Sequence, residues 1–107
     1  MRIKPYQSKY FEDCIKILRS NTPKYIDPSE HSMFMDYLSR DRITYFVLFD
    51  GLNLIACGGY GLNKQKTKAG LDWGLVQSKY HNKGYGSELL RYRLSHIQRN
   101  YPGIDIH

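Results

Sequence analysis

The feature that most constrains the fold of this chain is a loop with two glycines between a predicted strand and a predicted helix. Residues 69–77 predict the strand, and residues 87–100 carry apolar side chains at helical spacing. Between them, Gly84 and Gly86 let the main chain approach a ligand without an intervening Cβ atom. The helix needs a sheet to cover. Its buried face is expected to comprise Leu90, Leu94, Ile97 and Tyr101.

Two helices are expected in the first third of the chain, after a short strand over residues 2–6. Ser8 can cap a helix over residues 9–20. Asp27 is predicted to cap a second helix that ends near residue 39, because Glu30 three residues later completes a capping box. The buried faces of the two helices are expected to comprise Phe11, Cys14, Ile15, Leu18, Phe34, Tyr37 and Leu38.

The middle of the chain predicts antiparallel strands. Residues 44–49 and 52–62 are apolar and β-rich, and the Asp50-Gly51 pair between them is a tight-turn signal. The second of these strands contains three glycines, which mark a bulge or a close approach of the main chain: Gly58, Gly59 and Gly61. Residues 104–107 predict the start of a last strand. The order β-α-α-β-β-β-α-β indicates one mixed α/β domain over residues 1–107.

Composition and charge limit the classes of function that are possible but do not select one of them. The net charge is +6, which suits nucleic acid, anionic lipid or a phosphate-bearing cofactor, and the basic residues form no run typical of a polybasic arm. Cys14 and Cys57 lie in apolar stretches without metal-ligand spacing, so we expect packed thiols and no metal. Without a signal peptide or a membrane-length apolar run, we expect a cytoplasmic protein with no membrane partner.

The glycine loop has the properties of a phosphate site. The first amides of a helix lack internal partners, and the helix dipole adds positive charge to that of Lys79 and Lys83. The P-loop pattern is absent. The dinucleotide fingerprint is incomplete because Leu89 replaces its third glycine, although Asp105 lies at a spacing suited to a ribose-binding acid. A dinucleotide site therefore remains an alternative.

The motifs in and around this loop resemble those of one family. The run His81-Asn-Lys-Gly84-Tyr-Gly86 occupies the frame (Q/R)-x-x-G-x-(G/A), and residues 76–90 resemble V-x-P-x-(Y/F)-R-G-x-G-(I/Y)-G-x-x-L-L. With the order of elements, they resemble the GNAT superfamily of N-acetyltransferases across essentially the whole chain. His81 replaces the usual Gln or Arg but can still direct a donor at a phosphate, and Ser78 replaces a common Pro. The resemblance implies a mixed central sheet flanked by helices.

The resemblance also implies acetyl-coenzyme A as co-substrate, and an amine of a small molecule or protein as acceptor. The pantetheine arm would pair with the end of strand 69–77, the acyl carbonyl would meet a main-chain N–H at Leu75, and the diphosphate would lie on the loop amides. The expected cofactor-binding residues are Gly74, Leu75, Val76, His81, Asn82, Lys83, Gly84, Tyr85, Gly86 and Ser87.

Asp72 is the only carboxylate on this strand and is the candidate general base. Strict alternation would place it on one face with Gly74 and Val76, and Trp73 on the other. A solvent-facing carboxylate without a catalytic role is the alternative. Tyr25 and Tyr37 are candidates for lining the acceptor cleft, and packing in the core is the alternative for both.

Members of this family usually continue past the fifth strand with a helix and two strands, and that helix often supplies a tyrosine that protonates the leaving thiolate. Residues 1–107 stop where the fifth strand begins, so we expect a partial domain that could dimerise through an exposed sheet edge. A module that binds coenzyme A or a nucleotide without turnover is therefore a second hypothesis. A nucleic-acid binder is a third, but the tyrosines do not cluster with the basic residues as a stacking surface requires.

Overall fold

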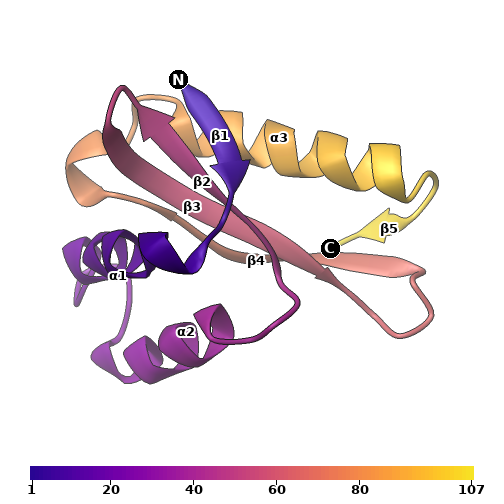
Figure 1. The fold of residues 1–107 in the computed structure, drawn as a ribbon, viewed down its shortest axis with the longest axis horizontal. Coiled ribbons are helices and arrows are strands. Elements are labelled where there is room, and N and C mark those ends of the chain that lie inside the picture. The colour runs from indigo at the N-terminus through magenta and orange to yellow at the C-terminus, as the bar shows by residue number, and fades with distance from the viewer.

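The computed structural model describes all 107 residues as a five-stranded sheet with helices on both faces (Figure 1). The strands follow the order β1-β2-β3-β4-β5, with antiparallel pairs up to β4 and a parallel pair between β4 and β5. They are β1 Arg2–Pro5, β2 Thr44–Asp50, β3 Asn53–Leu62, β4 Lys68–Val76 and β5 Asp105–Ile106. The helices are α1 Phe11–Ser20, α2 His31–Leu38 and α3 Tyr85–Asn100, with short 3-10 turns at Ser8–Tyr10, Pro28–Glu30 and Ser78–Tyr80. The predicted mixed α/β fold and its element order are confirmed.

The helical segment that begins after Asp27 starts as the sequence predicts, whereas the one that begins after Ser8 does not. Asp27 accepts from the Ser29 amide at 2.9 Å, and Glu30 accepts from the Asp27 amide at 3.1 Å, so the predicted capping box is confirmed. Ser8 caps nothing, because residues 8–10 form a 3-10 turn and α1 begins only at Phe11 without a side-chain cap. The prediction of Ser8 as a cap is wrong. No helix is both long enough and apolar enough to cross a bilayer.

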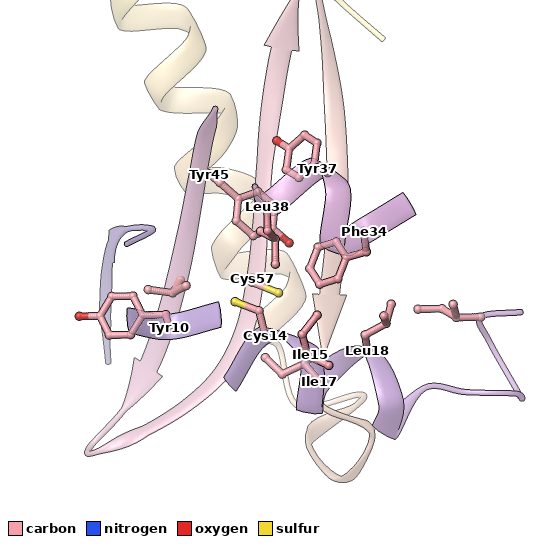
Figure 2. Packing of buried hydrophobic residues seen from close by; sticks show 12 residues of the cluster. Tyr10, Cys14, Ile15, Ile17, Leu18, Phe34, Tyr37, Leu38, Tyr45 and Cys57 are labelled. Atoms are coloured by element: carbon pink, nitrogen blue, oxygen red, sulfur yellow. The ribbon is translucent and has the colours of Figure 1, made fainter. Parts of the chain in front are cut away.

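Helices α1 and α2 cover one face of the sheet and enclose most of the apolar core (Figure 2). The cluster is built from Tyr10, Cys14, Ile15, Ile17, Leu18, Ile26, Phe34, Tyr37, Leu38, Tyr45, Val47 and Cys57. Figure 2 shows the sulfur atoms of Cys14 and Cys57 facing each other between α1 and β3. Both thiols are free and fully buried, so the expectation of packed cysteines is confirmed.

Helix α3 covers the opposite face of the sheet. The residues that it turns toward the sheet differ from those predicted. Leu89, Arg93 and Ile97 face the sheet, whereas Leu90 is 36% exposed and Leu94 is only half-buried. The prediction was wrong for these two leucines because it assigned only apolar residues to the buried face of the helix. A buried arginine takes the central position instead.

One glycine of β3 and one of β4 make room for that arginine. A Cβ atom on Gly58 would lie 3.0 Å from Cζ of Arg93, and a Cβ on Gly74 would lie 2.9 Å from its Nη2. Arg93 is 7% exposed, its Nη1 donates to the Gly59 carbonyl at 3.2 Å, and its Nε has no partner. The β3–β4 register shifts at the same place, between Cys57 and Gly59. The expected close approach of the main chain at the β3 glycines is confirmed, whereas the extra residue of the bulge lies opposite Gly58 in β4.

Candidate cofactor-binding site

A cleft of about 600 Å³ lies where β4 ends and α3 begins. Its walls come from the end of β4, the loop before α3 and the segment after α1. The lining residues are Asn21, Tyr25, Ile26, Gly74, Leu75, Val76, Tyr80, His81, Asn82, Gly84, Tyr85, Gly86 and Ser87. The structure thus brings all the expected cofactor-binding residues except Lys83 to one cavity. We call this cavity the cofactor cleft.

The loop beside the cleft ends in a helix start without a cap. Gly84 is the N-cap residue with φ of +90°, a left-handed conformation that favours glycine, and no side chain bonds to the first turn of α3. Its carbonyl accepts from the Glu88 amide at 3.0 Å, so the amides before Glu88 in this turn lack helical acceptors. Gly84, Gly86 and Ser87 are exposed. Main-chain donors and the positive end of the α3 dipole therefore face outward at the cleft.

The glycines leave space above this turn. A Cβ atom on Gly84 would meet nothing within 4 Å, and one on Gly86 would make only an ordinary contact of 3.5 Å with Val76 Cγ2. Larger side chains from Gly86 would extend into the cleft. Unpaired amides in an open, concave turn suit a diphosphate, so the residues present fit a phosphate-bearing cofactor.

Two side chains donate hydrogen bonds to the last carbonyl of β4. Nδ2 of Asn21 and Nε2 of His81 each donate to the Val76 oxygen at 2.9 Å. Asn21 is 4% exposed and also donates to the Ile17 carbonyl at 2.9 Å, so it connects the end of α1 to β4. The expectation that His81 directs a donor at a phosphate is therefore wrong for Nε2. Sequence reasoning missed Asn21, because an Asn after a helix signals only a helix end.

The outer edge of β4 is open along most of the strand. Strand β5 pairs only with Lys68 and Ala69, so the edge beyond them has no strand partner. The Gln77 amide donates toward β3, to Ile55 at 2.8 Å, and amide directions alternate along a strand. Hence the Leu75 N–H points toward β3, and that of Val76 points to the open edge. The Trp73 carbonyl accepts from the Tyr45 hydroxyl of β2, so the Gly74 N–H in the same planar peptide unit points the opposite way, away from β2 and β3. The direction of the Leu75 N–H therefore does not fit the expected contact with the acyl carbonyl.

The bulge in β4 changes the face that Asp72 occupies. Trp73 has φ of +43° and its carbonyl accepts from the Tyr45 hydroxyl at 2.7 Å. The Trp73 ring packs on Phe34 of α2, with ring centroids 5.0 Å apart, and Asp72 lies beside Tyr37 of the same helix. Asp72 and Trp73 therefore share the α2 face. The prediction of opposite faces is wrong because it assumed unbroken alternation.

Asp72 has an environment that perturbs its acidity. Burial raises its pKa above the ordinary aspartate value, against the opposing effects of the Tyr37 hydroxyl, Arg40 and Arg93. Burial also raises the pKa of Tyr37, and the Asp72 charge adds to this effect. Both side chains line a second cavity, separate from the cofactor cleft. Of the two tyrosines expected at the acceptor side, Tyr37 lies in this second cavity and Tyr25 in the cofactor cleft, edge-on to His81 at 5.1 Å.

The sequence profile of the Acetyltransferase (GNAT) family matches residues 11–105, almost the whole chain. This chain belongs to the GNAT acetyltransferase family. A comparison of its sequence with curated proteins finds no match.

Solved structures similar to this GNAT domain include three acetyltransferases. The ribosomal-protein-S18-alanine N-acetyltransferase from Escherichia coli has a TM-score of 0.76 and 16% identity, covering 92% of this chain and 60% of that one. A GNAT acetyltransferase from Brucella melitensis, solved with acetyl-CoA, has a TM-score of 0.76 and 14% identity, covering 92% and 69%. An aminoglycoside 6'-N-acetyltransferase complexed with coenzyme A has a TM-score of 0.74 and 15% identity, covering 92% and 56%. At these identities the likeness establishes the fold, and this GNAT domain spans little more than half of two of the three proteins.

Proposed function

We propose that this GNAT domain transfers an acetyl group from acetyl-coenzyme A to an amine. One observation carries the proposal: the uncapped, exposed start of α3 at Gly84, which faces the cofactor cleft with unpaired amides. A diphosphate on this turn would accept several main-chain hydrogen bonds and meet the positive end of the helix dipole. Two of the similar structures hold coenzyme A or acetyl-CoA, which supports the same ligand here.

The open edge of β4 would receive the pantetheine arm and the acyl group. Gly74 and Val76 offer main-chain N–H groups there, and either could polarise the acyl carbonyl. The Val76 carbonyl is already occupied by Asn21 and His81, so this edge offers a ligand more donors than acceptors at that point. Such an edge suits the carbonyl groups of a pantetheine arm.

Acetyl-CoA supplies an activated thioester, so the transfer needs only an attacking amine and a place for its proton. The amine nitrogen bonds to the acyl carbon, the carbon–sulfur bond breaks, and coenzyme A leaves as its thiolate. Asp72 is the candidate that receives the proton from the amine, directly or through water, because it lies only two residues from Gly74 on β4.

The proposal is tested first by binding. At a concentration 100-fold above its Kd, a ligand adds about 2.7 kcal/mol to the stability of the folded state. Millimolar acetyl-CoA should therefore raise the Tm of the chain by roughly 10 °C or more, given about 4–8 °C per kcal/mol for a small domain. The absence of any shift would overturn the proposal.

Gly86→Glu should abolish this shift, because a Cβ fits at Gly86 while the longer, charged side chain would fill the cleft and repel phosphate. Ser95→Glu makes the same charge change on an exposed residue of α3 outside the cleft, and should keep the shift. Release of free thiol is then followed with a panel of amines. Stabilisation without thiol release from any amine would indicate a coenzyme A-binding module in place of an enzyme.

A further inference from the structure

The second cavity of the domain, which we call the Asp72 pocket, lies beside β4 at the C-terminal end of α2. Its volume is about 480 Å³, a size suited to a small molecule. Its lining includes Tyr37, Arg40, Arg42, Lys66 and Asp72. It shares no lining residue with the cofactor cleft, so its occupant would be a different ligand.

The pocket carries an excess of positive charge that the protein itself does not neutralise. Three cations line it, Arg40, Arg42 and Lys66, against the single carboxylate of Asp72. None of the three forms an ion pair, because the one ion pair of the structure lies on α3 between Arg91 and Glu88.

Asp41 lies between the two arginines in sequence and lines a neighbouring cavity, which Arg40 also lines. Asp41 forms no ion pair with either arginine. The Arg40 guanidinium lies over the Tyr37 ring, 5.5 Å from its centroid, which orients it at the rim of the pocket. Two arginines near one cavity offer forked donors that match the oxygens of a carboxylate or a phosphate.

The placement of Asp72 connects this pocket to the transfer chemistry. The carboxylate projects over Gly61, where a Cβ would lie 3.0 Å from its Oδ2, and faces the α2 side of the sheet. An amine at Asp72 would be two residues along β4 from the Gly74 amide at the open edge. The cations would then contact the other end of the same molecule.

We propose that the Asp72 pocket binds the acceptor, and that the acceptor is a small amine carrying an anionic group, a carboxylate or a phosphate. This inference rests on the proposed acetyl transfer. The anionic group lies against Arg40, Arg42 and Lys66, and the amine lies toward Asp72. The basic side chains fix the orientation of the acceptor, whereas the cofactor cleft contributes nothing to its selection.

The test compares three amines that share the serine skeleton and carry no, one and two anionic groups: L-serinamide, L-serine and O-phospho-L-serine. Because the basicity of the amino group differs among them, kcat/KM is calculated for the free-amine form of each. With acetyl-CoA saturating, we expect kcat/KM to rise along this series by roughly tenfold for each anionic group, equivalent to one well-placed charge contact. Equal kcat/KM for the three amines, in a chain that acetylates them, would overturn the inference and leave the proposed function intact. Preference for the neutral amide would overturn it as well.

Two variants from one hairpin provide the matched comparison. Lys66→Gln should lower kcat/KM for phosphoserine severalfold and leave the KM for acetyl-CoA unchanged. Lys64→Gln removes the same charge from an exposed residue of the same turn that does not line the pocket, and should change neither value. Equal effects of the two substitutions would mean that only the general charge of the surface matters.

A binding measurement separates this inference from the proposed function. Phosphoserine and serinamide are titrated into the full chain and followed by NMR chemical shifts, without acetyl-CoA. Shifts confined to residues of the Asp72 pocket, seen with phosphoserine and reduced by Arg42→Gln, support the site even in a chain that acetyl-CoA fails to stabilise. The absence of phosphoserine shifts at the pocket overturns it, whatever the cofactor does.

Discussion

Replacing Asn21 with alanine should destabilise the domain more than any surface substitution near the cleft. The side chain is 4% exposed, and its amide donates to the carbonyls of Ile17 and Val76 at 2.9 Å each. A buried hydrogen bond contributes about 1–1.5 kcal/mol, so Asn21→Ala should lower the free energy of unfolding by roughly 2–3 kcal/mol. For a domain of this size, Tm should fall by roughly 10–15 °C. The Val76 carbonyl keeps His81 as a donor, which limits the loss.

Thermal unfolding followed by circular dichroism measures this loss, with Asn100→Ala as the control. Asn100 ends α3 and donates to the His96 carbonyl four residues earlier at 2.8 Å, as Asn21 does to Ile17 at the end of α1. Asn100 is exposed, so its loss should cost less than about 1 kcal/mol. Equal losses for the two variants would refute the reasoning, because the contact with β4 and the burial of Asn21 would then contribute nothing.

Three further outcomes are expected. Gly84→Ala should cost about 1 kcal/mol in urea unfolding, because the strain comes from its φ of +90° while the space around it is open, and a much larger loss would reveal a steric clash. Cys14 and Cys57 should react with a thiol reagent only after denaturant is added, since both are fully buried, and rapid labelling of the native chain would contradict their packing. As a base, Asp72 must be ionised, so kcat/KM should fall as pH drops through its raised pKa; a variant Asp72→Asn that keeps this acid limb would exclude that role.

The sequence correctly predicted those structural elements that depend only on residues close together in the chain. The capping box at Asp27 needs only residues three apart, and the apolar run over β2 needs only β-rich composition, so both were predicted correctly. The glycine loop before α3 was also predictable, because a strand, two glycines and a helix follow one another along the chain. These residues now line one cleft in the structure.

Features that depend on distant segments could not be predicted. Burial of Arg93 at the centre of α3 requires the missing side chains of Gly58 and Gly74, which come from two strands. Periodicity in the sequence therefore predicted that Leu90 and Leu94 lie on the buried face of α3. The role of Asn21 depends in the same way on the Val76 carbonyl, 55 positions later in the chain.

The bulge in β4 determines which residues of the strand face each of the two cavities. The bulge at Trp73 and Gly74 exists where β3 and β4 approach closely, with the Arg93 guanidinium packed against Gly58 and Gly74 on the α3 side. A regular strand would have sent Asp72 and Gly74 to the same face, and Asp72 would then have pointed toward α3 and Arg93. Because of the bulge, the carboxylate faces α2 and the Asp72 pocket, while the Gly74 amide stays at the open edge beside the cofactor cleft. Under the proposed function, the donor and the acceptor would approach β4 from the two different cavities, and direct transfer would require their reacting atoms to come into contact between Asp72 and Gly74.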